Sequence, residues 1–398
     1  MTSSAPTRSP FPGTVEDGTR KKQNAATGAS AASIRAVSAQ FVAFYFRAPM
    51  KAFFRTRIDY MAYARAIDPR VQSAKSWSWR TTTAGVLAHA VKEHGWSFIP
   101  NQILPPMLAN VTVGAVLYTS YLQSLGVLYE PSSRSSKRVY PPPSLAHTFT
   151  AGFAAGTVQS VVAAPLDALQ VRFETNDMLE GKYRNMWHYA RDKLREIGPR
   201  GVFAGWSLSF VKDAFGYGAF FATFEYLKAQ SYYSFVTRYY GKYEPIFSFH
   251  PYRGTIREEN GRLTIRPHYA LEPTFILIAG IAASIVQQVV QHPLSKVQGF
   301  HYNRLESLDY AAKLQGSRSH MMRLYYHAYQ KTFEQCERQA SRHGGWRRWL
   351  YRGFFMNTIR QVPSTSAGLI VFEVVRRKYA RDSDVVRIEK DGYDVLLS

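Results

Sequence analysis

Two apolar segments of the chain, each long enough to cross a bilayer, contain a cation. Lys212 lies beside Asp213 in the segment 208–228, and Arg360 lies beside Gln361 in the segment 354–376. A charge at bilayer depth costs about 2.5–3.5 kcal/mol on insertion scales, so such residues usually mark a path for a polar solute. Arg holds a carboxylate through two parallel hydrogen bonds, and Lys supplies a point charge. An anionic solute is therefore favoured over the alternative, a network that only lines water.

Other site chemistries find no support in the sequence. There is no Gly-rich phosphate loop, no His-Glu-x-x-His, no supported Ser-His-Asp arrangement and no EF-hand loop. The single cysteine, Cys336, excludes an intramolecular disulfide and a cysteine-based zinc site. His292 is interpreted as a satisfied polar residue of a helix rather than a metal ligand. We therefore expect neither an enzyme nor a cofactor or metal.

The elements that position these cations are repeated. Gly152 stands 13 residues before Pro165, Gly280 stands 13 residues before Pro293, and Ala36 to Pro49 is a third, weaker copy. Each proline is followed by a second apolar segment, at 103–126, 208–228 and 354–376. Six segments of about 20 residues, in three similar pairs, predict six transmembrane helices. Gly152/Gly156 and Gly280/Ser284 are small residues four apart, which allow helix backbones to approach closely.

A shorter polar stretch separates the members of each pair. These stretches end near Gly95, Gly198 and Gly344, which indicates short amphipathic helices at the membrane interface. A mean hydropathy of -0.26 is low for a membrane protein, but a helix wall on a wet cavity can carry polar residues. The net charge of +22 is spread along the chain rather than clustered, so nucleic acid is not expected as a partner.

The residues after each proline resemble a known signature. Pro165-Leu-Asp167-Ala-Leu-Gln-Val-Arg172 resembles the mitochondrial carrier motif of Pro, any, acidic, any, any, basic, any, basic. Gly198–Gly205 and Gly345–Gly353 are similar to its second half, and Phe224-Glu225-Tyr-Leu-Lys228 and Phe372-Glu373-Val-Val-Arg376 to the motif that closes the even helices. The chain is identified on these residues as a divergent member of the mitochondrial carrier family with a degenerate first repeat.

This resemblance implies an all-α membrane protein. Six helices would form three homologous hairpins in a pseudo-threefold barrel, with short matrix-side helices and kinks at Pro49, Pro165 and Pro293. The chain divides into a disordered tail (1–29), repeat 1 (30–130), repeat 2 (144–230), a long hydrophilic and aromatic loop (231–272), repeat 3 (273–380) and a C-terminal tail (381–398). Glu16 and Asp17 argue against a cleaved transit peptide.

The resemblance also implies two gates, and the sequence departs from both. The matrix gate would comprise Lys51, Asp167, Gln170, Arg172, Ser295 and Gln298. Lys51 replaces an acid and Gln170 and Gln298 replace bases, so three ion pairs cannot form, and hydrogen bonds are expected beside one Lys51–Asp167 pair. The cytosolic gate would comprise Gln123, Glu225, Lys228, Glu373 and Arg376.

In this family, solute contacts lie about 13 positions before the closing acid of each even helix. That offset gives Asn110, Lys212 and Arg360, with Asp213 and Gln361 beside the two cations. Cardiolipin head groups are implied at Gly205 and at Tyr351-Arg352-Gly353, because backbone N–H groups at a helix start attract phosphate.

The favoured function is exchange of a small anionic metabolite across the mitochondrial inner membrane by a monomer. A carboxylate, a keto acid and an amino acid all remain open as solutes. The alternative is a degenerate carrier-fold adaptor without transport, acting in mitochondrial dynamics or protein insertion, in which case the outer membrane is possible.

Overall fold

The structure is a computed structural model of the chain. It describes residues 83–133, 141–171, 185–242, 256–259, 262–265, 271–315, 321–359, 386–390 and 393–397, with isolated positions at 34, 64–65, 68, 267 and 362. Most of this part is helical. The helices are α4 (Thr83–His94), η2 (Ile99–Ile103), α5 (Leu104–Leu128), η3 (Glu130–Ser133), α6 (Leu145–Val171), α8 (Met186–Val202), α9 (Trp206–Glu225), η4 (Tyr226–Ser231), α10 (Tyr232–Lys242), α11 (Leu271–Gln315), α12 (Met321–Arg342) and α13 (Trp346–Leu350).

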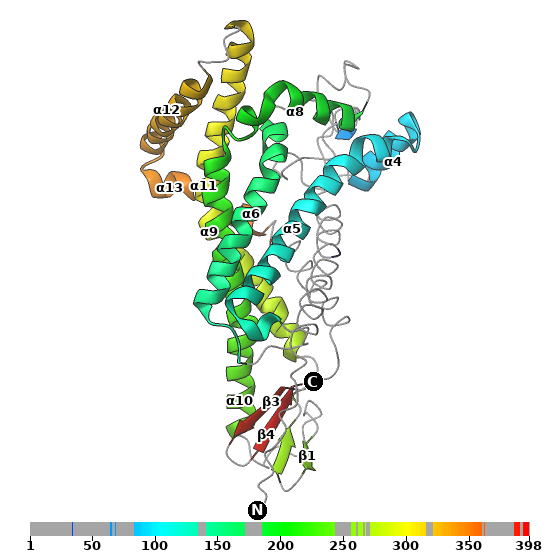
Figure 1. Cartoon of the computed structure of the whole chain (residues 1–398), viewed down its shortest axis with the longest axis vertical. Helices are drawn as coiled ribbons and strands as arrows, with labels where there is room; N and C mark the ends of the chain where they lie inside the picture. The colour runs from blue at the N-terminus through cyan, green and yellow to red at the C-terminus, as the bar shows by residue number, and fades with distance from the viewer. Residues whose placement is uncertain are drawn as a thin grey trace, which may run out of the picture.

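The long helices α5, α6, α9 and α11 run along the length of the molecule (Figure 1). Helix α6 packs against α5 and α9, and α9 packs in turn against α11. Elements adjacent in the chain are thus adjacent in space, as consecutive hairpins require. The predicted first span, with Pro49, and the predicted last span from residue 360 onward lie outside the described residues, so the six-helix barrel stays a prediction.

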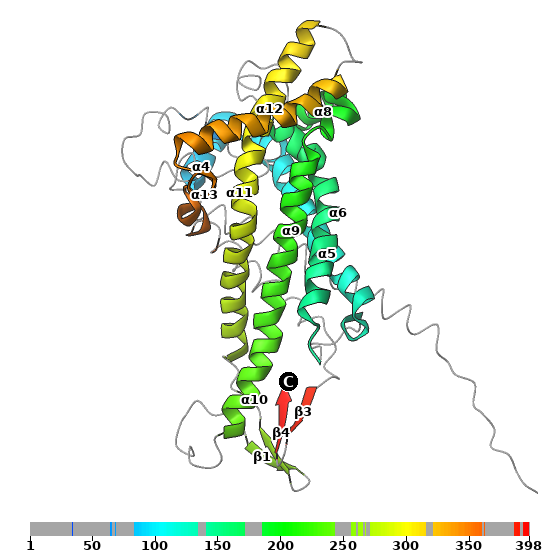
Figure 2. The same cartoon turned by 90° about the vertical axis from the view of Figure 1, so that its left-hand side faces the viewer.

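The interfacial helices predicted between the hairpin members are present. Helices α4, α8 and α12 lie at one end of the bundle, and α10 lies at the other (Figure 2). Gly95, Gly198 and Gly344 adopt φ angles of 75°, 67° and 78°. This left-handed conformation favours glycine, and it ends or interrupts each helix where the sequence predicted.

Several exposed residues of α6 and α11 are large and apolar, while several of their buried residues are polar. Val158 and Val161 on α6 and Ile281 and Ile285 on α11 are exposed. Polar residues of the same two helices are buried, among them Gln159, Ser160, Ser284, Gln287 and Gln288. Water would favour the reverse distribution, so this pattern fits helices surrounded by lipid that share a polar interior.

Three helical stretches of the described chain are long and apolar enough to cross a membrane: Ile99–Leu128, Leu145–Gln170 and Leu271–Leu305. Pro165 and Pro293 lie inside α6 and α11, which continue past them. Helix α9, predicted to be a span as well, is not in this set. It carries Lys212 and Asp213 and is flanked by α6 and α11, which shields its polar residues from lipid.

A small sheet adds strands to an otherwise helical chain. Strands β1 (Ile256–Glu259), β2 (Arg262–Ile265), β3 (Val386–Lys390) and β4 (Tyr393–Leu397) are arranged in the order β1-β2-β4-β3. The two hairpins are antiparallel, and β2 pairs with β4 in parallel, Leu263 opposite Tyr393. The segment predicted as a loop and the predicted C-terminal tail are therefore joined at the α10 end of the molecule (Figure 1).

The interior contact between α6 and α9 depends on glycine. A Cβ atom added at Gly152 would lie 2.7 Å from the backbone oxygen of Tyr217, and one at Gly156 would lie 2.5 Å from that of Asp213. Both distances are shorter than real side chains allow. The predicted small-residue face of α6 is thus in direct backbone contact with α9.

We predict that Cys336 is unreactive in the folded protein. It is fully buried on α12 among Val297, Ala340 and Trp349, and this burial raises the pKa of its thiol to about 11. At pH 8 the reactive thiolate should be about 100-fold rarer than for an ordinary thiol of pKa 9. Maleimide labelling at pH 8 should be slow until detergent or heat unfolds the protein. Rapid labelling of the native protein would contradict the burial of Cys336 described here.

Candidate functional site

The start of α9 presents polar side chains at a helical spacing. Ser209, Lys212 and Asp213 lie three and four residues apart, so they share the side of the helix that faces its neighbours. Ser209 and Asp213 are buried, with 1% and 2% of their surfaces exposed. Helix α6 approaches this side with Asp167, and α11 approaches it with Gln298 and Tyr302. The site is therefore built where three helices meet.

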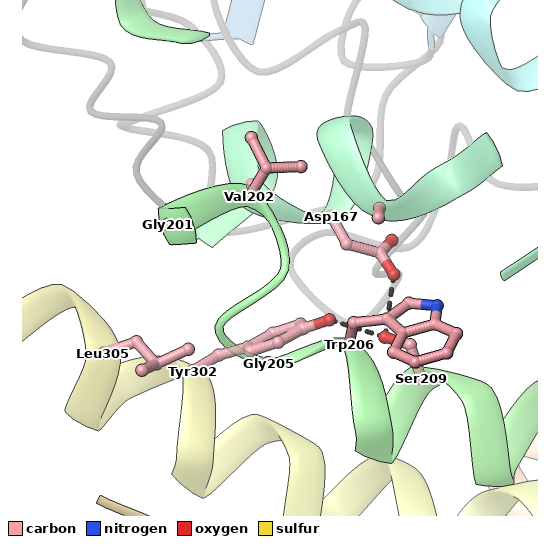
Figure 3. Close-up of a pocket in the computed structure, with 10 residues that line it drawn as sticks. Asp167, Gly201, Val202, Gly205, Trp206, Ser209, Tyr302 and Leu305 are labelled. Atoms are coloured by element: carbon pink, nitrogen blue, oxygen red, sulfur yellow. Dashed lines mark hydrogen bonds between the residues drawn. The ribbon is translucent and has the colours of Figure 1, made fainter. Parts of the chain in front are cut away.

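One hydrogen-bonded cluster connects the three helices. The Ser209 hydroxyl donates to Asp167 Oδ2 at 2.9 Å and lies 2.9 Å from the Tyr302 hydroxyl (Figure 3). Gln298 Nε2 donates to Ser209 Oγ at 2.6 Å and to the Tyr302 hydroxyl at 2.7 Å. Lys212 Nζ donates to Gln298 Oε1 at 2.8 Å. The cluster thus runs from a carboxylate on α6 to an ammonium on α9.

A small cavity adjoins the cluster. It measures about 10 Å³, about the space of one water molecule. Asp167, Ser209 and Tyr302 contribute its polar wall (Figure 3). Its other lining residues are small or apolar: Ala164, Ala168, Gly201, Val202, Gly205, Trp206 and Leu305. This space is too small for a metabolite, so the cavity itself is not a solute site.

Lys212 has a second electrostatic neighbour. Its Nζ lies 3.8 Å from Asp213 Oδ1, and 15% of its side chain is exposed. Gln291 Nε2 also approaches the Lys212 carbonyl oxygen, at 3.5 Å. The ammonium is therefore balanced by one carboxylate and held by one neutral amide. An incoming anion could replace the amide without separating the ion pair.

The predicted solute residues are only partly described. Lys212 and Asp213 lie together in the cluster region, while Asn110 is half-buried on α5. Arg360 and Gln361 lie outside the described residues. Whether Arg360 faces Lys212 stays a prediction.

The predicted matrix-gate residues separate into two groups. Asp167 and Gln298 join the cluster with Lys212. Gln170 is half-buried on α6, and Ser295 is exposed on α11. Lys51 and Arg172 lie outside the described residues, and so does the expected Lys51–Asp167 pair.

The described part of the predicted cytosolic gate is local. Lys228 Nζ lies 3.3 Å from Glu225 Oε1, three residues away on the same helical stretch, and 5.5 Å from the centre of the Phe224 ring. Gln123 is exposed on α5. Glu373 and Arg376 lie outside the described residues.

The predicted lipid-binding residues differ in exposure. Gly205 is buried before α9, where a Cβ atom would lie 2.8 Å from the Tyr302 ring. Tyr351, Arg352 and Gly353 are exposed and precede the helical turn 354–359, with Gly353 at a φ of 81°. The Tyr351 hydroxyl donates to the Val289 carbonyl at 3.0 Å, which anchors this corner to α11.

Sequence reasoning missed Ser209 and Tyr302, which connect the predicted gate to the predicted solute site. Neither belongs to a motif. Tyr302 follows Gln298 by four residues and Ser209 precedes Lys212 by three, so both lie one helical turn from a predicted residue. Extending each predicted position by one turn would have included them. For His292, ring nitrogens lie 3.4 Å from the Arg352 carbonyl oxygen and 3.3 Å from Asn357 Nδ2, as a satisfied polar residue requires.

Comparison with known proteins relates part of this helical arrangement to a known family. Residues 141–234, which include α6, α8 and α9, match the family model of the mitochondrial carrier protein. Solute carrier family 25 member 45 of Homo sapiens is 33% identical over 133 residues, covering 31% of this chain and 45% of that protein. Over these residues the chain is similar to the mitochondrial carrier family.

Two further carriers extend this comparison. Mitochondrial thiamine pyrophosphate carrier 1 of Aspergillus oryzae is 30% identical over 146 residues, covering 37% of this chain and 44% of that protein. Mitochondrial adenine nucleotide transporter ADNT1 of Arabidopsis thaliana is 26% identical over 268 residues, covering 66% of each. The matches span less than half the length of the first two relatives. All three relatives are named as carriers or transporters.

Proposed function

We propose that this protein is a mitochondrial carrier that exchanges a small anionic metabolite across the mitochondrial inner membrane by alternating access. The observation that supports this proposal most directly is Lys212. Its ammonium lies where α9 meets α11, paired at 3.8 Å with Asp213 and hydrogen-bonded to the neutral amide of Gln298. A buried ammonium among lipid-facing helices costs stability, so a role in solute binding explains its presence.

Asn110, Asp213, Arg360 and Gln361 would complete the solute site. A carboxylate would displace Gln298 from Lys212 because a charge-assisted hydrogen bond is about twice as strong as one to a neutral acceptor. The Asp213 carboxylate could accept the amine of an amino acid. We therefore place a carboxylate, a keto acid or an amino acid first among the anions to test. The relatives named for thiamine pyrophosphate and adenine nucleotides make phosphorylated anions the next class.

Several other assignments belong to the same proposal. Asp167 and Gln298 would close the matrix side by hydrogen bonds, while Glu225 and Lys228 would act with Glu373 and Arg376 on the cytosolic side. Tyr351, Arg352 and Gly353 would hold cardiolipin, and the carrier would act as a monomer. Two of the three relatives are named as mitochondrial, and nothing in the comparisons favours the outer membrane.

Reconstitution into liposomes tests this function. Purified protein should exchange at least one labelled carboxylate, keto acid, amino acid or phosphorylated anion against the same unlabelled solute inside. Empty liposomes should show none. If no anion of this panel exchanges with folded protein in cardiolipin-containing liposomes, transport of such a solute is wrong.

One observation favours the second candidate, a carrier-fold adaptor. Helix α10 and the sheet extend the α10 end of the molecule with segments that a barrel of six spans does not require. An adaptor would use this end to bind another protein. Failure of exchange together with specific capture through residues 231–272 would favour this candidate.

A further inference from the structure

The contact between the long helices at the end that carries α8 and α12 needs an explanation. The ion pairs that usually close a carrier at this end cannot all form. Gln170, Ser295 and Gln298 stand at positions that would carry charges. Nevertheless α6, α9 and α11 are joined at this level by the cluster around Ser209. Ser209 and Tyr302 lie at its centre, and no motif assigns either of them a role.

The donors of the cluster all point in one direction. Ser209 has a single hydroxyl proton, which it donates to Asp167 Oδ2. Tyr302 must therefore donate its own proton to Ser209 Oγ across their 2.9 Å contact. The Gln298 amide donates to both hydroxyl oxygens and accepts from Lys212. Every donor thus points from the ammonium of Lys212 toward the carboxylate of Asp167.

We propose that these five residues form a polar latch that replaces the missing ion pairs: Asp167, Ser209, Lys212, Gln298 and Tyr302. Ser209 and Tyr302 are its positioning residues, since they connect the opposite charges of Lys212 and Asp167 through hydrogen bonds. The amide and hydroxyl dipoles are aligned with the field between the charges, so each bond polarises the next. The latch is buried, with Ser209, Gln298 and Asp167 exposed by only 1%, 5% and 6%.

The latch makes closure depend on the proposed solute site, and in this respect the inference rests on the proposed function. Lys212 is both the cationic end of the latch and the proposed anion-binding group. An anion that binds the Lys212 ammonium in place of Gln298 Oε1 leaves the latch without its positively charged end. The remaining bonds weaken, and α11 can separate from α6 and α9. Solute binding thereby opens the latch through Gln298 and Tyr302.

A thiol placed beside the latch reports its opening. Ala168 is buried and lines the cavity next to Asp167 and Ser209, so an Ala168→Cys variant should react with a water-soluble maleimide only when the latch opens. Cys336 gives a slow background because it is buried. Adding Tyr302→Phe removes one hydroxyl and keeps the ring that packs against Gly205. Labelling of the introduced thiol should then accelerate about fivefold, the effect of one hydrogen bond.

The matched control is Tyr329→Phe in the same Ala168→Cys protein. The Tyr329 hydroxyl also joins two elements at this end, donating to the Ala204 carbonyl at 3.0 Å and accepting from Ser207 at 2.8 Å. It belongs to α12 and not to the latch. Its removal should leave the labelling rate of the introduced thiol unchanged. If Tyr302→Phe unfolds the protein, Ser209→Ala replaces it, with the same expected acceleration.

The outcomes separate the latch from transport. Equal labelling with and without the Tyr302 hydroxyl, or equal acceleration by Tyr329→Phe, would overturn the latch whatever the exchange assay shows. Faster labelling with Tyr302→Phe in a protein that exchanges no solute would support the latch and contradict the proposed function. If a solute exchanges, adding it should accelerate labelling of the introduced thiol in the Ala168→Cys protein that keeps Tyr302 and Ser209. No acceleration by that solute would refute the coupling through Lys212.

Discussion

Replacing Lys212 by methionine is expected to lower solute exchange about 100-fold, the upper range for removal of a charged hydrogen-bonding group. Methionine keeps much of the length of the side chain but removes the ammonium, which lies 2.8 Å from Gln298 Oε1 and 3.8 Å from Asp213 Oδ1. The initial rate of labelled-solute uptake into loaded liposomes measures the effect.

The change also harms stability, because it removes the ammonium from beside the buried carboxylate of Asp213. Breaking a buried pair by removing one partner costs about 3–5 kcal/mol. Adding Asp213→Asn removes that carboxylate charge as well, so the double variant should recover much of the lost thermal stability in detergent. Exchange should stay low if Lys212 binds the solute. Recovery of exchange with recovery of stability would show that Lys212 acts only as the structural partner of Asp213.

A lysine outside the site provides the matched control. Lys193 on α8 is as buried as Lys212, with 11% of its side chain exposed, and lies 3.5 Å from Glu196. Lys193→Met should leave the exchange rate within about twofold of the parent, because Lys193 pairs with a partly exposed carboxylate away from the proposed solute site. The single variant Asp213→Asn refines the solute class, since it should slow exchange of an amino acid more than exchange of a simple dicarboxylate.

The parts of this fold that repeat could be predicted from the sequence. The Gly-to-Pro spacing predicted helices at α6 and α11, and the polar stretches ending in glycine predicted α4, α8 and α12. These predictions succeed because each depends on local chemistry: apolar length, a proline, or a glycine with positive φ. The resemblance places solute contacts about 13 residues before the closing acid of each even helix. This spacing likewise predicted Lys212 as a site residue, and Lys212 belongs to the latch.

The sheet was missed for a different reason. Both hairpins have strong local signals, because Asn260-Gly261 and Asp391-Gly392 separate strands that pair residue for residue, Glu259 with Arg262 and Lys390 with Tyr393. Such dipeptides favour two-residue hairpin turns. The parallel pairing of β2 with β4 has no local signal, since it joins segments far apart in the sequence. Tertiary contact alone determines that register.

The latch shows the same limit at the level of side chains. Sequence patterns assigned Asp167 and Gln298 to a gate and Lys212 to a solute site, as if the two were separate. Their connection depends on how α9 is rotated against α11, which the contact between α6 and α9 at Gly156 helps to fix. Ser209 and Tyr302 acquire a role only through that rotation. A sequence motif identifies residues only by their positions in the chain. The hydrogen bonds of the latch require donor–acceptor distances of about 3 Å between residues on different helices.

Introducing a single methyl group at Gly156 should therefore be one of the most destabilising small changes in this protein. A Cβ atom there would lie 2.5 Å from the Asp213 carbonyl oxygen and 2.9 Å from the Ala214 Cα. Both are backbone atoms that cannot move aside unless α9 shifts. Gly156→Ala should cost about 3 kcal/mol of stability, the upper range for overpacking, and should lower the unfolding temperature in detergent markedly.

The control lies at the same interface. The three atoms nearest to a Cβ atom at Gly218 on α9 would all belong to the Phe149 ring, the first at 3.0 Å, and a side chain can rotate away at small cost. Gly218→Ala should therefore lower the unfolding temperature far less than Gly156→Ala. Because α9 carries Ser209, Lys212 and Asp213, Gly156→Ala should also disturb the latch and accelerate labelling of the Ala168→Cys protein, whereas Gly218→Ala should not. Equal effects of the two substitutions would mean that α6 and α9 are not in the backbone contact described here.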